Sequence, residues 1–475
     1  MAPAKRDRLA VQKTRRLKNG RQDSIYQITL RGLSKINRSV IFFAVFTAFF
    51  LFFVLEIKLN FGRDLPVEIQ MEKLNPDAQL YFYLARNLVD GNGYYDKLKN
   101  DEILPSIGHP FLLAVFCVIL KMSPAAFAWL FFVISFILLS AAVWIYSRSN
   151  IILILALWLY CGFFKHLEWL SGNVESSIVF TNLLLAAALA VFYKTGFNKK
   201  SAILAGCSLF VQILTRPVFL SPLHFFLVVC VVVVLYRYLR RRHLPLSRFI
   251  AGWLVLLITA EGLVLATYGY SYLRYRDSRL VSGTYGVTAL YAGNNIYLPT
   301  NHEYLARWRH PQEFLEKIYI LRNNPGMTWQ QRHKILMQEV VNYWKQYPVR
   351  AIQGWWWRFG QFVGIYAGSK GPHMVLHTLS ASALLVLVVV RVLVGIFWKK
   401  EELELKNSFG LVCAAMFFMY SAIHAVFSYS AFRYAAVTLV LLAPAVACLL
   451  YEIKPLLGRL AAVILVSLNQ TKSAT

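Results

Sequence analysis

The stretch PAAFAWLFFVISFILLSAAVWIY, residues 124–146, decides the structural class of this protein. It holds no charged residue, and as a helix it would be apolar on every side rather than along one stripe. A helix needs about 20 apolar residues to cross the hydrocarbon core of a bilayer. Runs of similar length recur through the 475 residues, which are 58% hydrophobic with a mean hydropathy of +0.50. The sequence therefore predicts an all-α, multi-pass membrane protein.

The distribution of positive charge predicts how these runs cross the membrane. The net charge is +27, and the first 38 residues are rich in Lys and Arg, which favours the cytoplasmic side for them. The run 108–121 is short for a span and opens with His109-Pro110, so we expect a juxtamembrane or re-entrant helix on the outer side. A bundle of about ten to twelve spans is then expected. Ten of them have clear bounds, at 39–59, 124–146, 151–168, 176–193, 201–219, 222–238, 248–268, 374–398, 408–427 and 432–450. The apolar stretch LLGRLAAVILVSL near the end is left unassigned.

This topology divides the chain into four expected parts. They are a basic cytoplasmic tail (1–38), an N-terminal transmembrane catalytic module (39–268) with a first external loop (60–123), an external loop or cap domain (269–373), and C-terminal transmembrane helices with a tail (374–475). The basic tail fits anionic lipid headgroups better than nucleic acid.

The external loop 269–373 carries helical patterns of its own. We expect helices at 312–323 and at 328–347, the second beginning after Thr328 as its N-cap. The loop is also rich in Tyr and Trp. That composition fits either an aromatic belt at the lipid surface or a surface that contacts a sugar or a lipid.

Two acidic residues fall on the predicted outer side. Asp77 precedes LYFYLARNL, whose apolar positions predict a short helix along the membrane that ends at Gly91. It is a candidate catalytic acid, although an acid at a helix start also simply complements the helix dipole. Glu175 lies just before a span, where it is either a functional acid or a solvated loop residue.

Three basic residues on the same predicted side suit a phosphate group. Arg216-Pro217 closes one span and Arg433-Tyr434 opens another, both at the outer end. An arginine beside an apolar wall can bind phosphate with two parallel hydrogen bonds, or it can reach for lipid headgroups. His109 is a third candidate, for a phosphate or for an acid.

Several kinds of site are absent from the sequence. There is no P-loop, HExxH motif, nucleophile elbow or dinucleotide fingerprint. None of the six cysteines forms a CxxC pair, and all lie in apolar segments, so we interpret them as small buried residues (Cys117, Cys161, Cys207, Cys230, Cys413 and Cys448). No motif predicts a bound metal.

Taken in order, these segments resemble the GT-C superfamily of membrane glycosyltransferases. The nearest likeness is to bacterial members similar to protein mannosyltransferases and aminoarabinose transferases. The resemblance covers residues 39–450 and rests on an ordered series: Asp77 with YFYLARNLVDGNGYY, His109-Pro110-Phe111, Glu175, Arg216-Pro217, YAGNNIYLP (291–299) and Arg433-Tyr434. Two positions depart from the family pattern. Ala78 stands where a second acid usually follows the first, and Phe432 stands where Glu often precedes the Arg-Tyr pair.

The resemblance implies a GT-C-type bundle with external juxtamembrane helices, and an inverting transfer of a sugar. The donor would be a polyprenyl-phosphate sugar, and the acceptor a lipid, glycan or protein on the outer face. Asp77 would be the general base that takes the proton of the acceptor hydroxyl, and Glu175 a second acid at the acceptor or at a metal. No cofactor is required, and a divalent metal is left open. The phosphate would be bound by Arg216, Arg433 and His109, with support from Tyr81, Tyr434 and Asn294.

Other functions remain as alternatives. An O-antigen ligase or polymerase would use a lipid-pyrophosphate donor and would not need Asp77. A lipid or solute transporter would place charges inside the bundle, and Glu261 within the span 248–268 fits that reading. A scaffolding membrane protein would need none of these acids and arginines. The short loops lean towards a prokaryotic plasma (inner) membrane, with the active site facing the periplasm or exterior.

Overall fold

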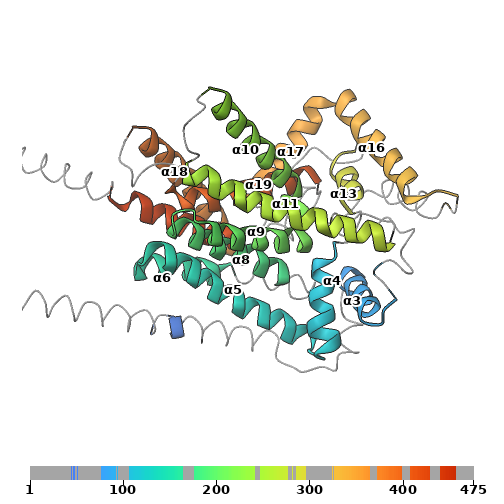
Figure 1. Ribbon diagram of the computed structural model, residues 1–475, viewed down its shortest axis with the longest axis horizontal. Coiled ribbons are helices and arrows are strands. Elements are labelled where there is room, and N and C mark those ends of the chain that lie inside the picture. The colour runs from blue at the N-terminus through green and yellow to red at the C-terminus, as the bar shows by residue number, and fades with distance from the viewer. Residues whose placement is uncertain are drawn as a thin grey trace, which may run out of the picture. The chain divides into compact units, whose positions relative to one another are not determined.

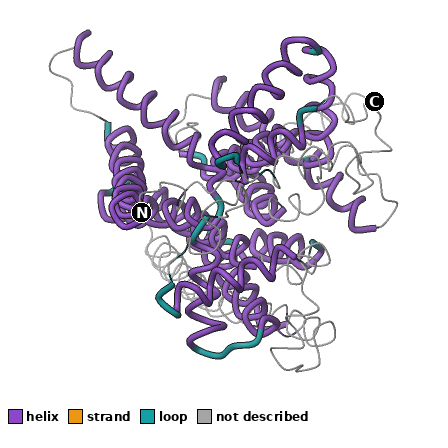
Figure 2. The backbone as a smooth tube through the Cα atoms, turned by 90° about the vertical axis from the view of Figure 1, so that its right-hand side faces the viewer, coloured by secondary structure: helices purple, strands orange, loops and turns teal. Residues whose placement is uncertain are grey.

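The computed structural model describes most of the predicted membrane-spanning part of the chain. The described residues are 76–92, 94, 106–163, 176–240, 247–275, 281, 285–295, 324, 326–363, 372–397, 407–427 and 439–455, with isolated positions at 44, 46–48 and 51. Within these ranges the ordered elements are helices, and Figure 2 draws no strand among them. The prediction of an all-α protein is therefore confirmed for the described residues.

The described helices up to residue 275 come in the following order along the chain. They are α3 (Pro76–Val89), α4 (Gly108–Leu113) with its π-helical continuation η1 (Ala114–Ile119), α5 (Pro124–Ser147), α6 (Asn150–Gly162), α8 (Ser176–Lys194), α9 (Lys199–Thr215), the 3-10 turn η2 (Pro217–Phe219), α10 (Leu220–Arg240) and α11 (Arg248–Tyr275). Further along the chain come α13 (Tyr285–Gly293), α16 (Trp329–Gln346), α17 (Pro348–Phe362), α18 (Pro372–Phe397) and α19 (Phe409–Phe427). A last helix covers residues 439–455.

A row of neighbouring helices forms the main body of the bundle (Figure 1). In this row α6 packs on α5, α5 on α8, α8 on α9, α9 on α11 and α11 on α10. Neighbours in the row are mostly neighbours in sequence, because a short connection between two helices brings the second back beside the first. Gly206 lets α9 approach α11 closely, since a Cβ at that position would lie 2.6 Å from the main-chain oxygen of Leu256.

Six described helices are long and apolar enough to cross a membrane. They comprise α5, α8, η2 with α10, α11, α18 and α19. The protein is therefore a multi-pass membrane protein by the length and composition of its helices. The described residues do not show the predicted count of ten to twelve spans. The expected span 201–219 is described but is not among the six, and α6 in the expected span 151–168 has only 13 residues. Most of the expected span 39–59 and part of 432–450 lie outside the described residues.

Several helix bounds differ from the prediction for identifiable reasons. The expected span 201–219 is interrupted, because α9 ends at Thr215 and Pro217 opens a separate turn. Proline cannot donate its backbone N–H and disfavours helix at the residue before it. In contrast, α11 continues to Tyr275, beyond the expected end at 268. The short run 108–121 is helical over 108–119, as predicted.

The two local predictions outside the spans are also confirmed. Helix α3 begins at Pro76 and is followed by Gly91, which has the positive φ of +73° that favours glycine after a helix. Helix α16 begins after Thr328, whose side chain and that of Gln331 form a capping box. The expected helix 312–323 lies outside the described residues.

Candidate functional site

Helix α3 carries Asp77 in its first turn and packs against α4. One turn further along α3, the ring of Tyr81 meets the imidazole of His109 edge-on, with ring centroids 4.6 Å apart. Ala78, Phe82 and Ala85 of α3 are buried in a cluster with residues of α4 and α5. This packing fixes the position of the helix that bears Asp77.

His109 joins the Asp77 helix to the end of a membrane-spanning helix. Its side chain is 3% exposed, and its Nδ1 lies 2.6 Å from the hydroxyl oxygen of Ser177 in the first turn of α8. Ser177 stands two residues after Glu175 in the sequence. The imidazole is thus held between Tyr81 and Ser177, which fixes its orientation within the protein.

The beginning of α4 lies directly on the end of α9. The hydroxyl of Ser106 donates to the main-chain oxygen of Thr215 at 3.1 Å. Gly108 is required there, because a Cβ would stand 2.5 Å from the main-chain oxygen of Leu214 and the nitrogen of Thr215. The next residue after this contact is Arg216, so α4 connects the Asp77 helix to the predicted phosphate-binding arginine.

Arg216 in turn lies near the end of α19. The partly buried Arg216 interacts electrostatically with His424 of α19. The following turn η2 packs on the same helix through Phe219, whose ring centroid is 5.6 Å from that of Tyr420. A continuous path of contacts therefore leads from Tyr81 through His109 and the end of α9 to Arg216 and His424.

Side chains from the segment 269–373 bind the C-terminal part of α19. The amide of Asn294, after α13, donates to the main-chain oxygen of Val426 at 2.6 Å. Its own oxygen accepts from the indole N–H of Trp344 at 3.0 Å. The indole of Trp355 donates to the oxygen of Ala422 at 3.3 Å. The bond to Val426 satisfies a carbonyl group that the end of the helix leaves unpaired, and the bond to Ala422 adds to one within the helix. Asn294 thereby has a structural role at the site.

Arg358 of α17 is a candidate residue that the sequence analysis missed. Its side chain is 3% exposed, and its Nε donates to the main-chain oxygen of Ala425 at 2.6 Å. Burial lowers the pKa of Arg358 to about 10, and the nearby Tyr343 partly opposes this shift. A signal existed in the sequence, because helical spacing puts Arg358 on the same face as Trp355 and Phe362.

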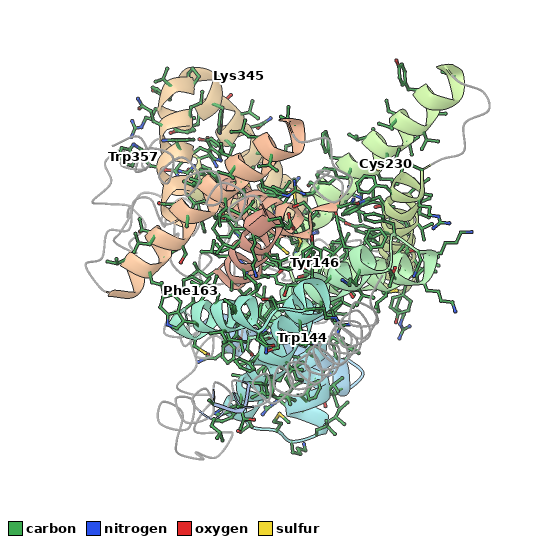
Figure 3. The ribbon with its side chains drawn as sticks, turned by 90° about the vertical axis from the view of Figure 1, so that its left-hand side faces the viewer. Trp144, Tyr146, Phe163, Cys230, Lys345 and Trp357 are labelled. Atoms are coloured by element: carbon green, nitrogen blue, oxygen red, sulfur yellow. The ribbon has the colours of Figure 1, made fainter. Side chains whose placement is uncertain are left out.

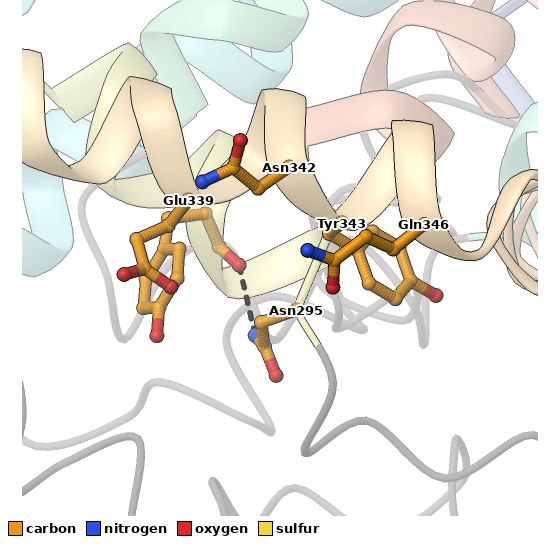
Figure 4. A pocket seen from close by; sticks show the side chains of 6 residues that line it. Asn295, Glu339, Asn342, Tyr343 and Gln346 are labelled. Atoms are coloured by element: carbon orange, nitrogen blue, oxygen red, sulfur yellow. Dashed lines mark hydrogen bonds between the residues drawn. The ribbon is translucent and has the colours of Figure 1, made fainter.

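A small polar pocket lies between the end of α13 and α16 (Figure 4). It encloses about 150 Å³ and is lined by Tyr291, Asn295, Glu339, Asn342, Tyr343 and Gln346. Asn295 is anchored there by its amide, which donates to the main-chain oxygen of Tyr291 at 2.8 Å. The volume is below the range of roughly 300–1,000 Å³ for sites that enclose drug-sized ligands.

A second buried polar network, also missed, lies at the opposite end of α19. Glu452 accepts from Arg391 Nε at 2.7 Å, from the hydroxyl of Tyr146 at 2.9 Å and from the backbone N–H of Gly410 at 2.9 Å. The hydroxyl of Ser408 also donates to it. Tyr146, labelled in Figure 3, comes from the end of α5. The network therefore joins α5, α18, α19 and the helix 439–455.

The remaining predicted site residues lie outside the described residues. These are Glu175, Arg433 and Tyr434. Among the residues that are described, no group of three or more His, Cys, Asp or Glu side chains could hold a metal ion. The six cysteines are free, and the predicted burial holds for Cys117, Cys413 and Cys448, whereas the other three are partly buried.

Comparison with known proteins gives no family for this chain. No family model matches the sequence, and neither a curated protein nor a solved structure matches it.

Proposed function

We propose that this protein is an inverting membrane glycosyltransferase of the GT-C type, which moves a sugar from a polyprenyl-phosphate donor to an acceptor on the outer face of the membrane. The observation that supports this most is the contact path through His109. It links α3, which carries Asp77, to the end of α9, where Arg216 follows. An acid and a phosphate-binding cation at the same end of a bundle are what this reaction needs.

In this mechanism Asp77 accepts the proton of the acceptor hydroxyl as that oxygen attacks the anomeric carbon. The bond from the anomeric carbon to the phosphate oxygen breaks, and the electron pair leaves with the lipid phosphate. Cations stabilise the phosphate as its charge grows, and Arg216 with Arg433 are the candidates. His109, buried between Tyr81 and Ser177, would position the Asp77 helix rather than bind the phosphate directly.

A second candidate function rests on a contact between two ionisable side chains in membrane-spanning helices. His224 Nε2 of α10 lies 3.3 Å from Glu261 Oε1 of α11. Ionisable residues within a span are costly, and they often mark the path of an ion or a substrate. A lipid or solute transporter is therefore the alternative, and it predicts that Glu261→Gln abolishes function while Asp77→Asn does not.

The experiment that tests the proposal compares Asp77→Asn with Asp90→Asn. Both variants replace a carboxylate by the corresponding amide. Asp77 lies in the first turn of α3, whereas Asp90 directly follows the last residue of the same helix. Transfer from a panel of radiolabelled polyprenyl-phosphate sugars is measured in membranes. We expect a loss of transfer of roughly a hundredfold or more for Asp77→Asn, the usual contribution of a general base, and little change for Asp90→Asn. Full activity of a folded Asp77→Asn protein would disprove the mechanism, and transfer from pyrophosphate donors alone would favour a ligase.

A further inference from the structure

The guanidinium of Arg358 is a buried charge without a carboxylate partner in the described part of the chain. The ion pairs found there join His224 to Glu261 and Arg391 to Glu452. The hydrogen bond of Arg358 to the main-chain oxygen of Ala425 uses one of its five N–H groups. A buried charge normally has a counter-charge. Moving an ion from water into a protein costs on the order of several kcal/mol, even after the protein relaxes around it.

Capping the end of α19 does not by itself require a charge at this position. A neutral donor caps the neighbouring carbonyl group, since the amide of Asn294 donates to the oxygen of Val426. The negative end of a helix dipole favours a cation by only about 0.3–1 kcal/mol at an exposed site, and up to about 2 kcal/mol in a partly buried one. The pKa of Arg358 is lowered to about 10, so the group stays protonated at neutral pH.

The described residues whose interactions connect to Arg358 are cationic or neutral rather than acidic. Phe362, one turn further along α17, stacks on His424 with ring centroids 5.8 Å apart. His424 interacts with Arg216. On the other side Tyr343 interacts with both Arg358 and Arg350. Positive charge thus converges on the last turn of α19 in a low-dielectric setting, where an anion would be strongly attracted.

We propose that Arg358 binds a phosphate-type oxyanion at the end of α19, together with Arg216. A guanidinium matches a phosphate with two parallel hydrogen bonds, and the anion would supply the counter-charge that the described residues lack. The inference rests on the proposed function to the extent that the phosphate belongs to the donor lipid. Free phosphate and an ordinary anionic headgroup present the same chemistry, and the test separates these sources.

The test measures binding rather than sugar transfer, so it remains informative if the transferase proposal fails. The purified full-length protein in detergent is titrated with three probes at constant ionic strength: inorganic phosphate, a long-chain isoprenyl phosphate, and mixed micelles containing phosphatidylglycerol. The apparent Kd is taken from the shift in Tm. Wild type is compared with Arg358→Gln, which keeps a neutral donor for Ala425 but removes the charge. Trp355→Phe is the matched control, because it removes a neighbouring hydrogen bond to α19 and no charge.

We expect Arg358→Gln to bind the isoprenyl phosphate at least roughly tenfold more weakly than wild type does. Trp355→Phe should bind it as tightly as wild type. The same pattern with inorganic phosphate or with phosphatidylglycerol would support the site and identify the broader source. Equal affinity of wild type and Arg358→Gln for all three probes would overturn the proposal, as would an equal loss in Trp355→Phe. If Arg358→Gln does not fold, Arg358→Lys is used in its place, because lysine keeps the positive charge but lacks the planar guanidinium and its paired N–H donors. Weaker binding in that variant supports the site, and unchanged binding overturns it.

Discussion

Glu452 is a buried carboxylate whose two oxygens accept hydrogen bonds from four different residues. Three of these donors are side chains, and one is the backbone N–H of Gly410. Arg391, its ion-pair partner, is 1% exposed. A pair this enclosed contributes to stability only when all of its polar groups are satisfied, because both ions have lost their water. Its role follows from these bonds: the network joins helices that are distant in sequence.

Removal of one partner of this ion pair should therefore strongly destabilise the folded protein. We expect Glu452→Ala to lower the free energy of unfolding by about 3–5 kcal/mol, because it removes the carboxylate that pairs with the buried Arg391 charge. Asp90→Ala, at an exposed position, should change it by less than about 0.5 kcal/mol. Thermal unfolding of the purified protein in detergent measures both. The double variant Arg391→Met with Glu452→Leu should regain most of the loss, and equal damage in the single and double variants would contradict this account.

At the scale of elements, the contact between α4 and α9 is what aligns the parts of the candidate site. Gly108 lies against the main chain of Leu214 and Thr215, so neither side can yield by rotating a side chain. His109 follows immediately on α4, and Arg216 follows immediately on α9. A displacement of α4 would thus separate the Asp77 helix from the end of α9.

We accordingly expect Gly108→Ala to lower both stability and transfer. The added Cβ would force α4 away from α9, at a cost of about 1–3 kcal/mol, the range for overpacked positions. Gly262→Ala in α11 is the matched control, because a Cβ there meets nothing within 4 Å. That variant should be neutral or more stable by about 0.5–1 kcal/mol. Tm and the rate of transfer are measured for both, and a Gly108→Ala protein with wild-type values would refute the close contact.

The elements that the sequence predicted well depend on local patterns. The bounds of α3 and α16 follow from Gly91 and Thr328, which act within a few residues of their own helix. Pro217 is an equally local signal for the break after α9, although the expected bound at 219 runs past it. The contacts at the ends of α19 are different in kind. Arg358 binds a residue 67 positions away, and Asn294 one 132 positions away. No periodicity within either helix predicts such pairs.

At the scale of the whole molecule, exposure within the helices indicates which of them face lipid. In the apolar window of α8, 72% of the residues are buried, whereas in that of η2 with α10 only 11% are. A span as apolar as α10 with so little protein around it needs a lipid environment. Helix α8 therefore lies inside the bundle, and α10 lies at its edge.

The proposed site needs the ends of α9 and α19 that carry Arg216 and His424 to face outward, and that orientation can be tested directly. Positive charge predicts that Lys199, at the start of α9, lies inside and that Lys345, in α16, lies outside. Both side chains are exposed, so a cysteine at either position should be reactive. We expect a membrane-impermeant maleimide to label Lys345→Cys in intact cells, and to label Lys199→Cys only after the membrane is permeabilised. The six native cysteines are buried or partly buried, so wild type provides the background. The reverse pattern would place Arg216 and His424 on the cytoplasmic side, and a donor sugar at the outer face could not reach them.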